Sequence, residues 1–245
     1  MHDPTALIQR FQALHGYADA AVEQAARSDP GFMAAYLDMA AVALESGPLE
    51  PRMRSFAMIA ANASVTHMNR DAVRHHVDAA RRQGASDAEL REVLQIASVL
   101  GIHGYMLGAP ILLQEARKLA GRGADERPEL GEREAVVREA FRQGRGYWSE
   151  LLEDMLAASP EFFQAYTAFS SHPWKTGVLL PKQRELLYVA IDASTTHLHE
   201  AGTRIHTHNA LRCGATPAEV IQVVQIVSCL GMQSYLLGMP CLAAA

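Results

Sequence analysis

The sequence predicts an all-α protein that consists of two similar helical units in tandem. Apolar residues recur at spacings of three and four along the chain, and no run of alternating apolar and polar residues is long enough for a strand. The chain also matches itself without a gap when shifted by 130 residues, the separation of Pro51 and Pro181. A repeat at a fixed period indicates copies of one structural unit. Further matched pairs include Arg54/Arg184, His67/His197, His76/His206, Gly84/Gly214, Glu89/Glu219, Tyr105/Tyr235 and Pro110/Pro240.

The first helices of each copy are marked at their N-termini. Asp29 and Ser159 each precede a proline, which is the pattern of an N-cap followed by proline at the first helical position. A glycine then marks a turn, and a second proline opens the next helix, which we expect to run to about Ser64 or Ser194. The turn and proline pairs are Gly47/Gly177 and Pro51/Pro181.

The later helices of each copy are bounded by a glycine and a capping box. Gly84 and Gly214 fit left-handed C-caps. The pairs Ser86–Glu89 and Thr216–Glu219 fit the capping box, in which a hydroxyl and a glutamate satisfy free backbone amides reciprocally. Long apolar helices follow over 90–100 and 220–230, and we expect Gly101, Gly108 and Pro110, with their counterparts, to interrupt or end them.

The charged segment 121–128 is rich in helix breakers and is the predicted linker between the copies. We therefore expect a first helical repeat over 1–120, a linker and entry helix over 121–145, and a second repeat over 146–245.

The composition excludes several classes of protein. Charged residues make up 20% of the 245-residue chain and its net charge is -5, so nothing favours nucleic acid as a partner. The N-terminal residues lack a signal peptide, and no apolar run reaches the roughly 18 residues that a membrane span needs. We expect a cytoplasmic protein with no membrane partner. The chain has three cysteines, Cys213, Cys229 and Cys241. Their odd number and the absence of a CxxC pair argue against a disulfide framework and a zinc knuckle.

Histidines are concentrated in two corresponding segments. Eight of the eleven lie within 67–103 and 197–208, namely His67, His75, His76, His103, His197, His199, His206 and His208. Neutral histidine is the natural general acid or base near neutral pH. The polar positions that both copies keep are Thr66/Thr196, His67/His197, Arg74/Arg204 and His76/His206.

The geometry of these histidines depends on where their helix begins. If the helix is continuous from residue 197, His199, Thr203 and His206 share one face, and His197, Glu200, Arg204 and His208 share the other. If it begins near Asp71 or Ala201, the first histidine lies in a loop and His206 lies about two turns into the helix. We favour the second arrangement, because Gly202 is poorly placed inside a longer helix.

A longer pattern gives a family resemblance. The segment 206–221, with His206, Ala210-Leu211, Gly214-Ala215-Thr216 and Glu219, resembles the signature of the carboxymuconolactone decarboxylase and alkylhydroperoxidase D-like family. The segment 181–187 is similar to the helix that precedes that signature, and the first copy repeats the pattern from His76 to Glu89. The resemblance covers roughly 48–112 and 178–242. It implies the all-helical fold of that family, which assembles as trimers or hexamers of single units, so we expect a trimer of tandem chains.

The family contains at least two chemistries. One branch is a thiol peroxidase with a CxxC pair, and the other is a cofactor-free decarboxylase that acts on a lactone acid. The positions of the two cysteines correspond to His199 and Gly202 in the second copy, and to Asn69 and Ala72 in the first. Because a thiol peroxidase needs a thiolate nucleophile, the resemblance favours a cofactor-independent lyase or isomerase on a small carboxylated or lactone substrate.

The predicted catalytic residues follow from this resemblance and from the histidine pattern. They are His206, His197, Arg204, His199 and Glu200 in the second copy, and His76, His67 and Arg74 in the first. Arg204 would hold a substrate carboxylate and His206 would supply a proton, with His197 orienting or relaying. Structural roles for these side chains, including ion pairs of Arg74 and Arg204 with nearby carboxylates, are the alternative.

We expect no cofactor and no metal. His197, His199, Glu200, His206 and His208 are acceptable zinc or iron ligands, but no HxxxH or HExxH pair is present. His199 and His206 would lie about 10 Å apart along a helix, which is too far for one ion. The remaining alternatives are a non-catalytic binding or assembly protein on the same fold, a peroxidase-like oxidoreductase, and a histidine–metal enzyme.

Overall fold

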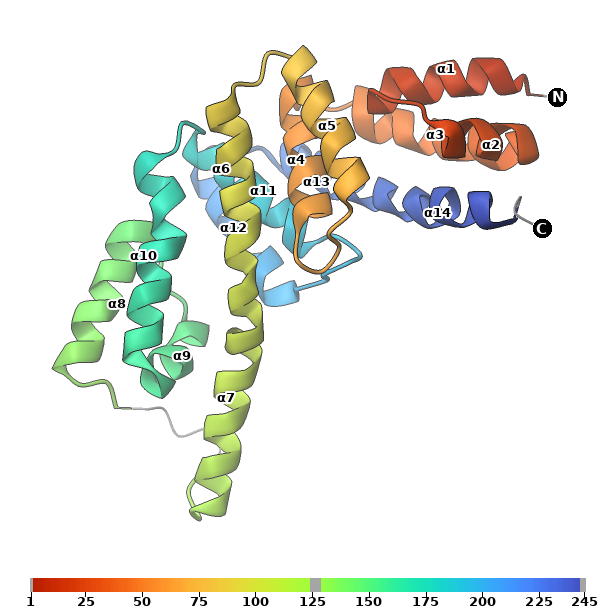
Figure 1. The fold of residues 1–245 in the computed structure, drawn as a ribbon. Coiled ribbons are helices and arrows are strands. Elements are labelled where there is room, and N and C mark those ends of the chain that lie inside the picture. Colours follow the sequence, from red (N-terminus) through yellow and green to blue (C-terminus); the bar gives the residue numbers. More distant parts are fainter. Residues whose placement is uncertain (1, 124–128, 243–245) are drawn as a thin grey trace. The chain divides into compact units, whose positions relative to one another are not determined.

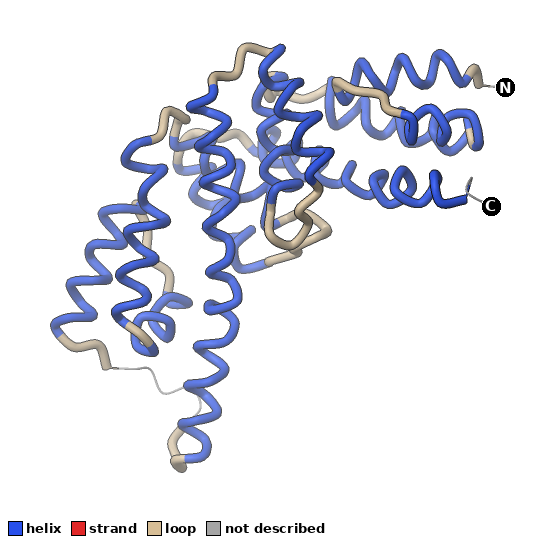
Figure 2. Tube along the Cα trace, viewed as in Figure 1, coloured by secondary structure: helices blue, strands red, loops and turns tan. Residues whose placement is uncertain are grey.

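The computed structural model describes residues 2–123 and 129–242, and within these residues the regular structure consists of helices alone (Figures 1 and 2). The all-α prediction is confirmed. Part of the predicted linker, residues 124–128, lies outside the described residues.

The chain packs as two compact units. The first comprises Met1–Ala97 and Val178–Ala245, and the second comprises Ser98–Gly177. The chain therefore leaves the first unit after Ala97 and returns to it at Val178. These packing units divide the chain differently from the sequence repeat, because the first unit contains segments of both copies.

The first unit contains most of the helices that the two copies share. They are α1 (Pro4–His15), α2 (Ala20–Ser28), α3 (Pro30–Glu45), α4 (Pro51–Ala63), α5 (Arg70–Arg82), α6 (Asp87–Ser98), α11 (Pro181–Asp192), α12 (Glu200–Arg212), α13 (Pro217–Ser228), η3 (Cys229–Gly231) and α14 (Met232–Leu242). The second unit contains η1 (Val99–Gly101), α7 (Ile102–Leu119), α8 (Glu132–Arg145), η2 (Glu150–Leu152), α9 (Glu153–Ala158) and α10 (Pro160–Thr176).

The helix ends agree with the capping signals in the sequence. The Asp29 carboxylate accepts from the Phe32 amide at 2.9 Å, and the Thr216–Glu219 capping box is formed. Gly84 and Gly214 have φ angles of +86° and +89°, as a left-handed C-cap requires. One expectation was wrong in detail: Pro110 lies inside α7, so the chain only makes a short 3-10 turn after α6 and then continues as a helix.

The core of the first unit is formed by α4 and α11, the pair of matching helices that pack against each other. Both are buried along almost their whole length, with Phe56, Ile59, Leu186 and Leu187 fully enclosed. Burial of such large side chains stabilises a fold by about 1.5–3 kcal/mol each. α5 covers α4, and α12 covers α11 in the same way.

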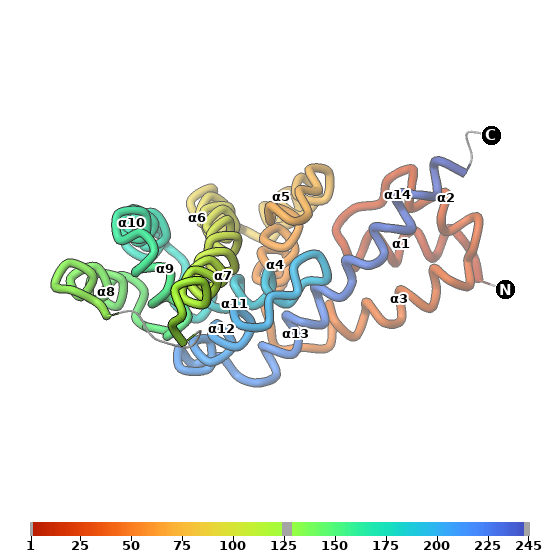
Figure 3. Tube along the Cα trace, turned by 90° about the horizontal axis from the view of Figure 1, so that it is seen from below, coloured from red at the N-terminus to blue at the C-terminus, as the bar shows by residue number. Residues whose placement is uncertain are grey.

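The N-terminal helices of this unit pack against its C-terminal helix. α1, α2 and α3 contact one another, and α14 lies against α2 (Figure 3). The Gln24 side-chain amide donates to the Met239 carbonyl at 2.8 Å, and the rings of Phe32 and Tyr235 meet edge-on at 4.9 Å. The N-terminal helices of the first copy are thus packed against α14, the last helix of the second copy.

The second unit has the corresponding arrangement. α8 packs on α10, and α7, the last helix of the first copy, packs on α9. The Tyr105 hydroxyl donates to the Met155 carbonyl at 2.9 Å, and Phe141 and Phe163 lie in the core beside Met155. The two copies therefore exchange their last helices, an arrangement that the repeat alone did not predict.

A buried side chain on the third shared helix of each copy also ties it to the other copy. The Glu92 carboxylate accepts from the Val178 and Leu179 amides at 2.5 and 2.8 Å and from Arg184 Nε at 2.5 Å. Its counterpart Gln222 accepts from the Leu49 amide at 2.7 Å. The link is therefore ionic in one direction and neutral in the other.

Two helical stretches are long and apolar enough to cross a membrane, by length and composition alone. They are Asp87–Leu119 and Pro217–Leu242, with 33% and 44% of the relevant windows buried. The expectation that no stretch is long enough was therefore too strict. A helix from the core of a soluble protein passes the same test.

We predict that Glu92→Gln lowers the free energy of unfolding by about 2–4 kcal/mol, because Arg184 then keeps a buried charge without its carboxylate partner. Urea unfolding followed by circular dichroism measures the change. The exposed Glu23→Gln, which removes a surface ion pair with Arg27, is the matched control and should cost less than about 1 kcal/mol. Equal stabilities of the Glu92 variant and the wild type would contradict the assigned role of the ion pair.

Candidate functional site

The candidate site is built on the short loop between α11 and α12. The amides of His197 and Leu198 both donate to the Ser194 carbonyl at 2.9 Å, and the His199 amide donates to the Asp192 carbonyl at 2.8 Å. Leu198 has a φ angle of +47°, a conformation that side chains other than glycine seldom adopt. The Leu198 side chain is exposed, and His197 and His199 lie on either side of it.

The first copy has the same loop between α4 and α5. Met68 has a φ angle of +52°, and the Asn69 amide donates to the Asn62 carbonyl at 2.9 Å. The expectation that this histidine lies in a loop is confirmed in both copies, since α5 and α12 begin at Arg70 and Glu200.

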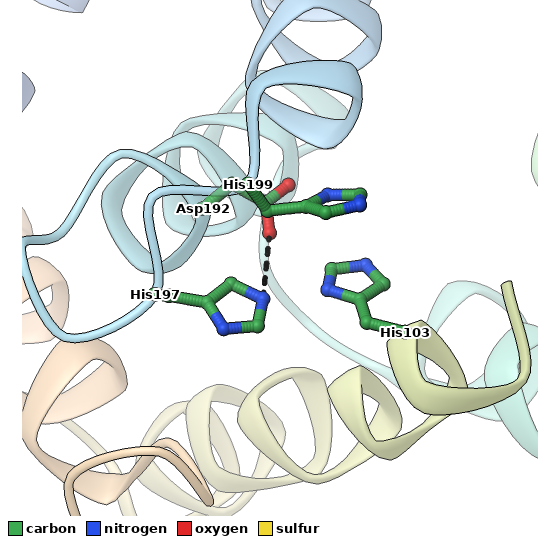
Figure 4. Close-up of side chains that lie close together, drawn as sticks. All are labelled: His103, Asp192, His197 and His199. Carbon is green, nitrogen blue, oxygen red and sulfur yellow. Dashed lines mark ion pairs between the residues drawn. The ribbon is translucent and has the colours of Figure 1, made fainter. Parts of the chain in front are cut away.

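The loop brings three ionisable side chains together in the second copy: Asp192, His197 and His199 (Figure 4). Their potential ligand atoms lie within 4.8 Å of one another. His197 Nε2 lies 3.8 Å from Asp192 Oδ1, which is an ion pair when the histidine is protonated. Figure 4 also labels His103, which belongs to the other packing unit.

His199 is the N-cap of α12, and this role fixes its tautomer. Its Nδ1 accepts a hydrogen bond from the Gly202 amide at 3.0 Å. An accepting Nδ1 has no proton, so the neutral ring carries its proton on Nε2. Burial lowers the pKa of His199, and the neighbouring His197 and His206 lower it further. Nε2 of His199 is therefore a hydrogen-bond donor at neutral pH.

Asp192 is an acid whose pKa lies close to neutrality. Its side chain is fully buried, and burial raises its pKa from the usual 3.8 to about 7. His206 opposes this rise and the charge on Glu185 adds to it. A carboxyl group with a pKa near 7 exchanges protons readily at neutral pH.

A second buried pair lies behind Asp192. His206 Nδ1 and Glu185 Oε2 are 2.7 Å apart, and the ring of Tyr188 stacks on the imidazole at 4.4 Å between centroids. In the tautomer with its proton on Nδ1, His206 donates to the Glu185 carboxylate, and Nε2 lies on the opposite side of the ring. Glu185, Tyr188 and Asp192 follow one another at spacings of three and four, so they share one face of α11.

The corresponding positions of the first copy carry no carboxylate. Ser55 and Asn62 stand where the second copy has Glu185 and Asp192. Gln233 Oε1 accepts from His67 Nε2 at 2.7 Å and from the Asn69 side-chain nitrogen Nδ2 at 2.8 Å. The Gln233 side-chain nitrogen Nε2 in turn donates to Asn62 Oδ1 at 2.8 Å. This network contains no carboxylate, and each of its groups has a defined partner.

His76, the first copy's counterpart of His206, is also in an environment that favours a neutral ring. Its pKa is lowered to about 3, mainly by burial and to a smaller extent by His15 and His75. Among the described residues of the two sites, the second copy alone combines a buried histidine with buried carboxylates.

The structure separates the predicted arginines from the predicted histidines. Arg204 lies on the exposed face of α12 and pairs with Glu200 at 2.9 Å, whereas His206 faces α11. Arg74 pairs with Asp71 at 3.0 Å in the same exposed setting. Both arginines thus form the ion pair with a nearby carboxylate that the structural alternative expected.

An open groove of about 650 Å³ runs along α12 in the second copy. Asp192 and Leu198 line it from the loop, and Thr203, Arg204 and Thr207 line it from the helix. Asp192 is thus both a member of the buried cluster and a lining residue of the groove.

Comparison with known proteins agrees with the repeat and the fold. The model of a family described as the carboxymuconolactone decarboxylase family matches residues 30–103 and again residues 160–232. The chain belongs to this family. No curated protein matches the chain.

Among solved structures, this family member is similar to a protein from Burkholderia xenovorans LB400 that is named provisionally as a gamma-carboxymuconolactone decarboxylase subunit. The two share 40% identity with a TM-score of 0.94, and the match covers 99% of this chain and 96% of the other. The likeness therefore extends over both family segments of this chain.

Sequence reasoning missed Glu185 and Asp192 as site residues of this family member. Both lie on a helix whose other buried residues are mainly apolar, which directed attention to the histidines. A signal was present: the two copies differ at these positions, with Ser55 and Asn62 in the first, and the two acids are seven residues apart on one helical face.

We predict that Asp192→Asn changes the pH dependence of stability. Between about pH 4 and pH 7 the folded wild type keeps a proton that the unfolded chain releases, so its free energy of unfolding falls as the pH rises through this window. The asparagine variant should lack this fall and be up to about 4 kcal/mol more stable at pH 8.

Urea unfolding between pH 4 and pH 8 measures this difference. Asp71→Asn, which removes an exposed carboxylate at a helix N-terminus, is the matched control and should keep the wild-type slope. A variant of Asp192 that is less stable than the wild type at pH 8 would mean that its carboxylate is stabilised as an anion.

Proposed function

We propose that this member of the carboxymuconolactone decarboxylase family is a cofactor-independent acid/base lyase or isomerase on a small carboxylated or lactone substrate. The second copy carries the site. The observation that supports this most directly is the buried hydrogen bond between His206 and Glu185, with Asp192 on the same face of α11 and a pKa near 7. Such a set can hold and release a proton at neutral pH without a cofactor.

In the proposed decarboxylation, the acid is Asp192, a buried residue in the lining of the groove that the bound substrate must reach. The bond between the substrate and its carboxylate breaks, CO₂ leaves, and the electron pair moves into the conjugated system of the substrate. Protonated Asp192 then delivers its proton to the carbon at the end of that system. His206, held by Glu185, restores the proton on Asp192 by way of Nε2.

The groove along α12 supplies the binding elements of the proposal. Arg204 lines it together with Asp192, so a second carboxylate of the substrate can exchange for Glu200 as the partner of the guanidinium. His199 presents its Nε2 proton next to Asp192 and can donate to a substrate oxygen. His197 helps to orient the Asp192 carboxyl group.

The proposal predicts that His206→Asn and Glu185→Ser each lower kcat at least about 100-fold, because the first loses the proton-exchanging nitrogen and the second its carboxylate partner. The probe substrate is carboxymuconolactone, the compound for which the family is named, and CO₂ release is the readout. Muconolactone-type acids in D₂O report isomerisation by deuterium uptake. His172→Asn, at an exposed histidine of α10, is the matched control.

Two outcomes would count against this assignment. If His76→Asn abolished turnover and His206→Asn did not, the active copy would be the first one. If the wild type neither released CO₂ nor exchanged deuterium with any lactone acid, the non-catalytic binding protein would be the better description.

A metal at Asp192, His197 and His199 is a competing use of the same side chains. The three offer ligand atoms at short range, but Nδ1 of His199 is engaged by the Gly202 amide and Nε2 carries its proton. Neither nitrogen is then available to an ion while the cap is intact.

We therefore predict that Zn²⁺ produces the same small change in Tm in the wild type and in His199→Asn. Asparagine caps the matching helix in the first copy, so this variant should fold normally. Differential scanning fluorimetry with and without Zn²⁺ makes the comparison. A rise in Tm that is present in the wild type and lost in the variant would favour the metal enzyme.

The dithiol peroxidase is disfavoured by packing as well as by sequence. A Cβ atom at Gly202 would collide with the Asp192 carboxylate, so a cysteine at this position would displace Asp192. We further propose that the protein is cytoplasmic and that it forms a homo-oligomer, a trimer of tandem chains, as its resemblance to the single-unit family members implies.

A further inference from the structure

The first copy contains a separate cavity of about 220 Å³ that the proposed reaction does not use. It lies among α1, α3, α4 and α5, all within the first packing unit. Its polar lining includes Arg54, His76 and Gln83, and its apolar lining includes Leu14, Leu44 and Met58. The cavity is smaller than the roughly 300–1,000 Å³ that is usual for ligand pockets, so with its one arginine and its apolar wall it suits only a small ligand.

Arg54 is the central feature of this cavity. Its guanidinium forms no ion pair or hydrogen bond with any other residue of the described chain. Its counterpart Arg184, by contrast, is buried and bonded to Glu92. The residue that matches Glu92 is the neutral Gln222. Its side chain hydrogen-bonds to the backbone of Leu49 and Ala43 and not to Arg54. The exchange of a carboxylate for an amide has therefore left a half-buried cation at the cavity.

Two further polar groups lie beside Arg54. Gln83 uses its Oε1 to accept from the Ser55 hydroxyl at 2.8 Å, so its amide N–H groups can serve a ligand. The low pKa of His76 keeps its ring neutral above about pH 4, so it can donate to or accept from a ligand without adding charge. Together with Arg54, these groups give the cavity several hydrogen-bond donors for the oxygens of a carboxylate.

Glu45 is the one acidic residue in the lining, and it is exposed. It lies close enough to raise the pKa of Arg54, which burial lowers. The two side chains are not in ion-pair contact. Glu45 therefore weakens the attraction of the cavity for an anion without neutralising Arg54, and its removal should strengthen binding.

We propose that this cavity of the first copy binds a small organic monocarboxylate with an apolar body, with Arg54 holding the carboxylate. The apolar body lies against Leu14, Leu44 and Met58. No carboxylate corresponds to Glu185 here, because Ser55 replaces it, so the ligand is bound and not turned over. The inference does not depend on the function proposed for the second copy.

The test uses benzoate as the probe and isothermal titration calorimetry on the full chain at pH 7.5. We expect Arg54→Gln to weaken benzoate binding at least about tenfold, because a charge-assisted contact is lost. Glu45→Gln should tighten binding severalfold, and Arg54→Lys should retain part of it. Arg27→Gln, which removes the same charge from an exposed site, is the matched control and should bind as the wild type does.

Three further measurements separate this inference from its alternatives. Benzamide, the neutral isostere, should bind at least about tenfold more weakly than benzoate, and so should sulfate if the apolar wall contributes. Benzoate binding in Glu185→Ser should equal that of the wild type, which distinguishes the cavity from the site in the second copy. If Arg54→Gln does not fold, the effect of Glu45→Gln decides.

The inference would be overturned by unchanged benzoate affinity in Arg54→Gln or in Glu45→Gln, by equal affinity for benzamide, or by loss of binding in Glu185→Ser. Equal affinity for sulfate would mean a general anion site and would overturn the assignment to monocarboxylates.

Discussion

The hydrogen bond from the His199 amide to the Asp192 carbonyl holds the candidate site together. It turns the chain back on itself after α11, so that the last residue of one helix lies beside the cap of the next. The left-handed Leu198 is the conformational cost of this turn, and such a cost is retained where the surrounding structure requires it. This turn is what brings the side chains of Asp192, His197 and His199 close together.

The same backbone supports opposite electrostatics in the two copies. In the first, Asn62, His67, Asn69 and Gln233 hydrogen-bond to one another in a network without a carboxylate. In the second, a carboxyl group replaces Asn62 and a histidine replaces Asn69, and burial then makes the charged form of Asp192 unfavourable. The position that carries the amide Asn62 in the first copy thus carries an ionisable carboxyl group, Asp192, in the second. Residues that lower stability in this way are typical of functional sites.

Most of the fold could be predicted because its signals are local. The caps at Asp29, Thr216 and Gly214 depend only on neighbouring residues, and each is formed as expected. The exchange of the last helices could not be predicted. An apolar helix face indicates that the face is buried, but it does not indicate which other helix covers it. The same limit applies to the site: the loop position of His197 followed from local signals, whereas its proximity to Asp192 depends on how the chain turns.

The packing of α14 on α2 also has a consequence for the order in which the protein can form during synthesis. The helices at the N-terminus emerge from the ribosome first, but the surface that covers α2 belongs to residues 232–242. The first three helices therefore remain incompletely packed while the roughly 200 residues between α3 and the end of α14 are synthesised. At about 5–20 residues per second this interval is about 10–40 seconds, during which chaperones can bind their exposed apolar faces.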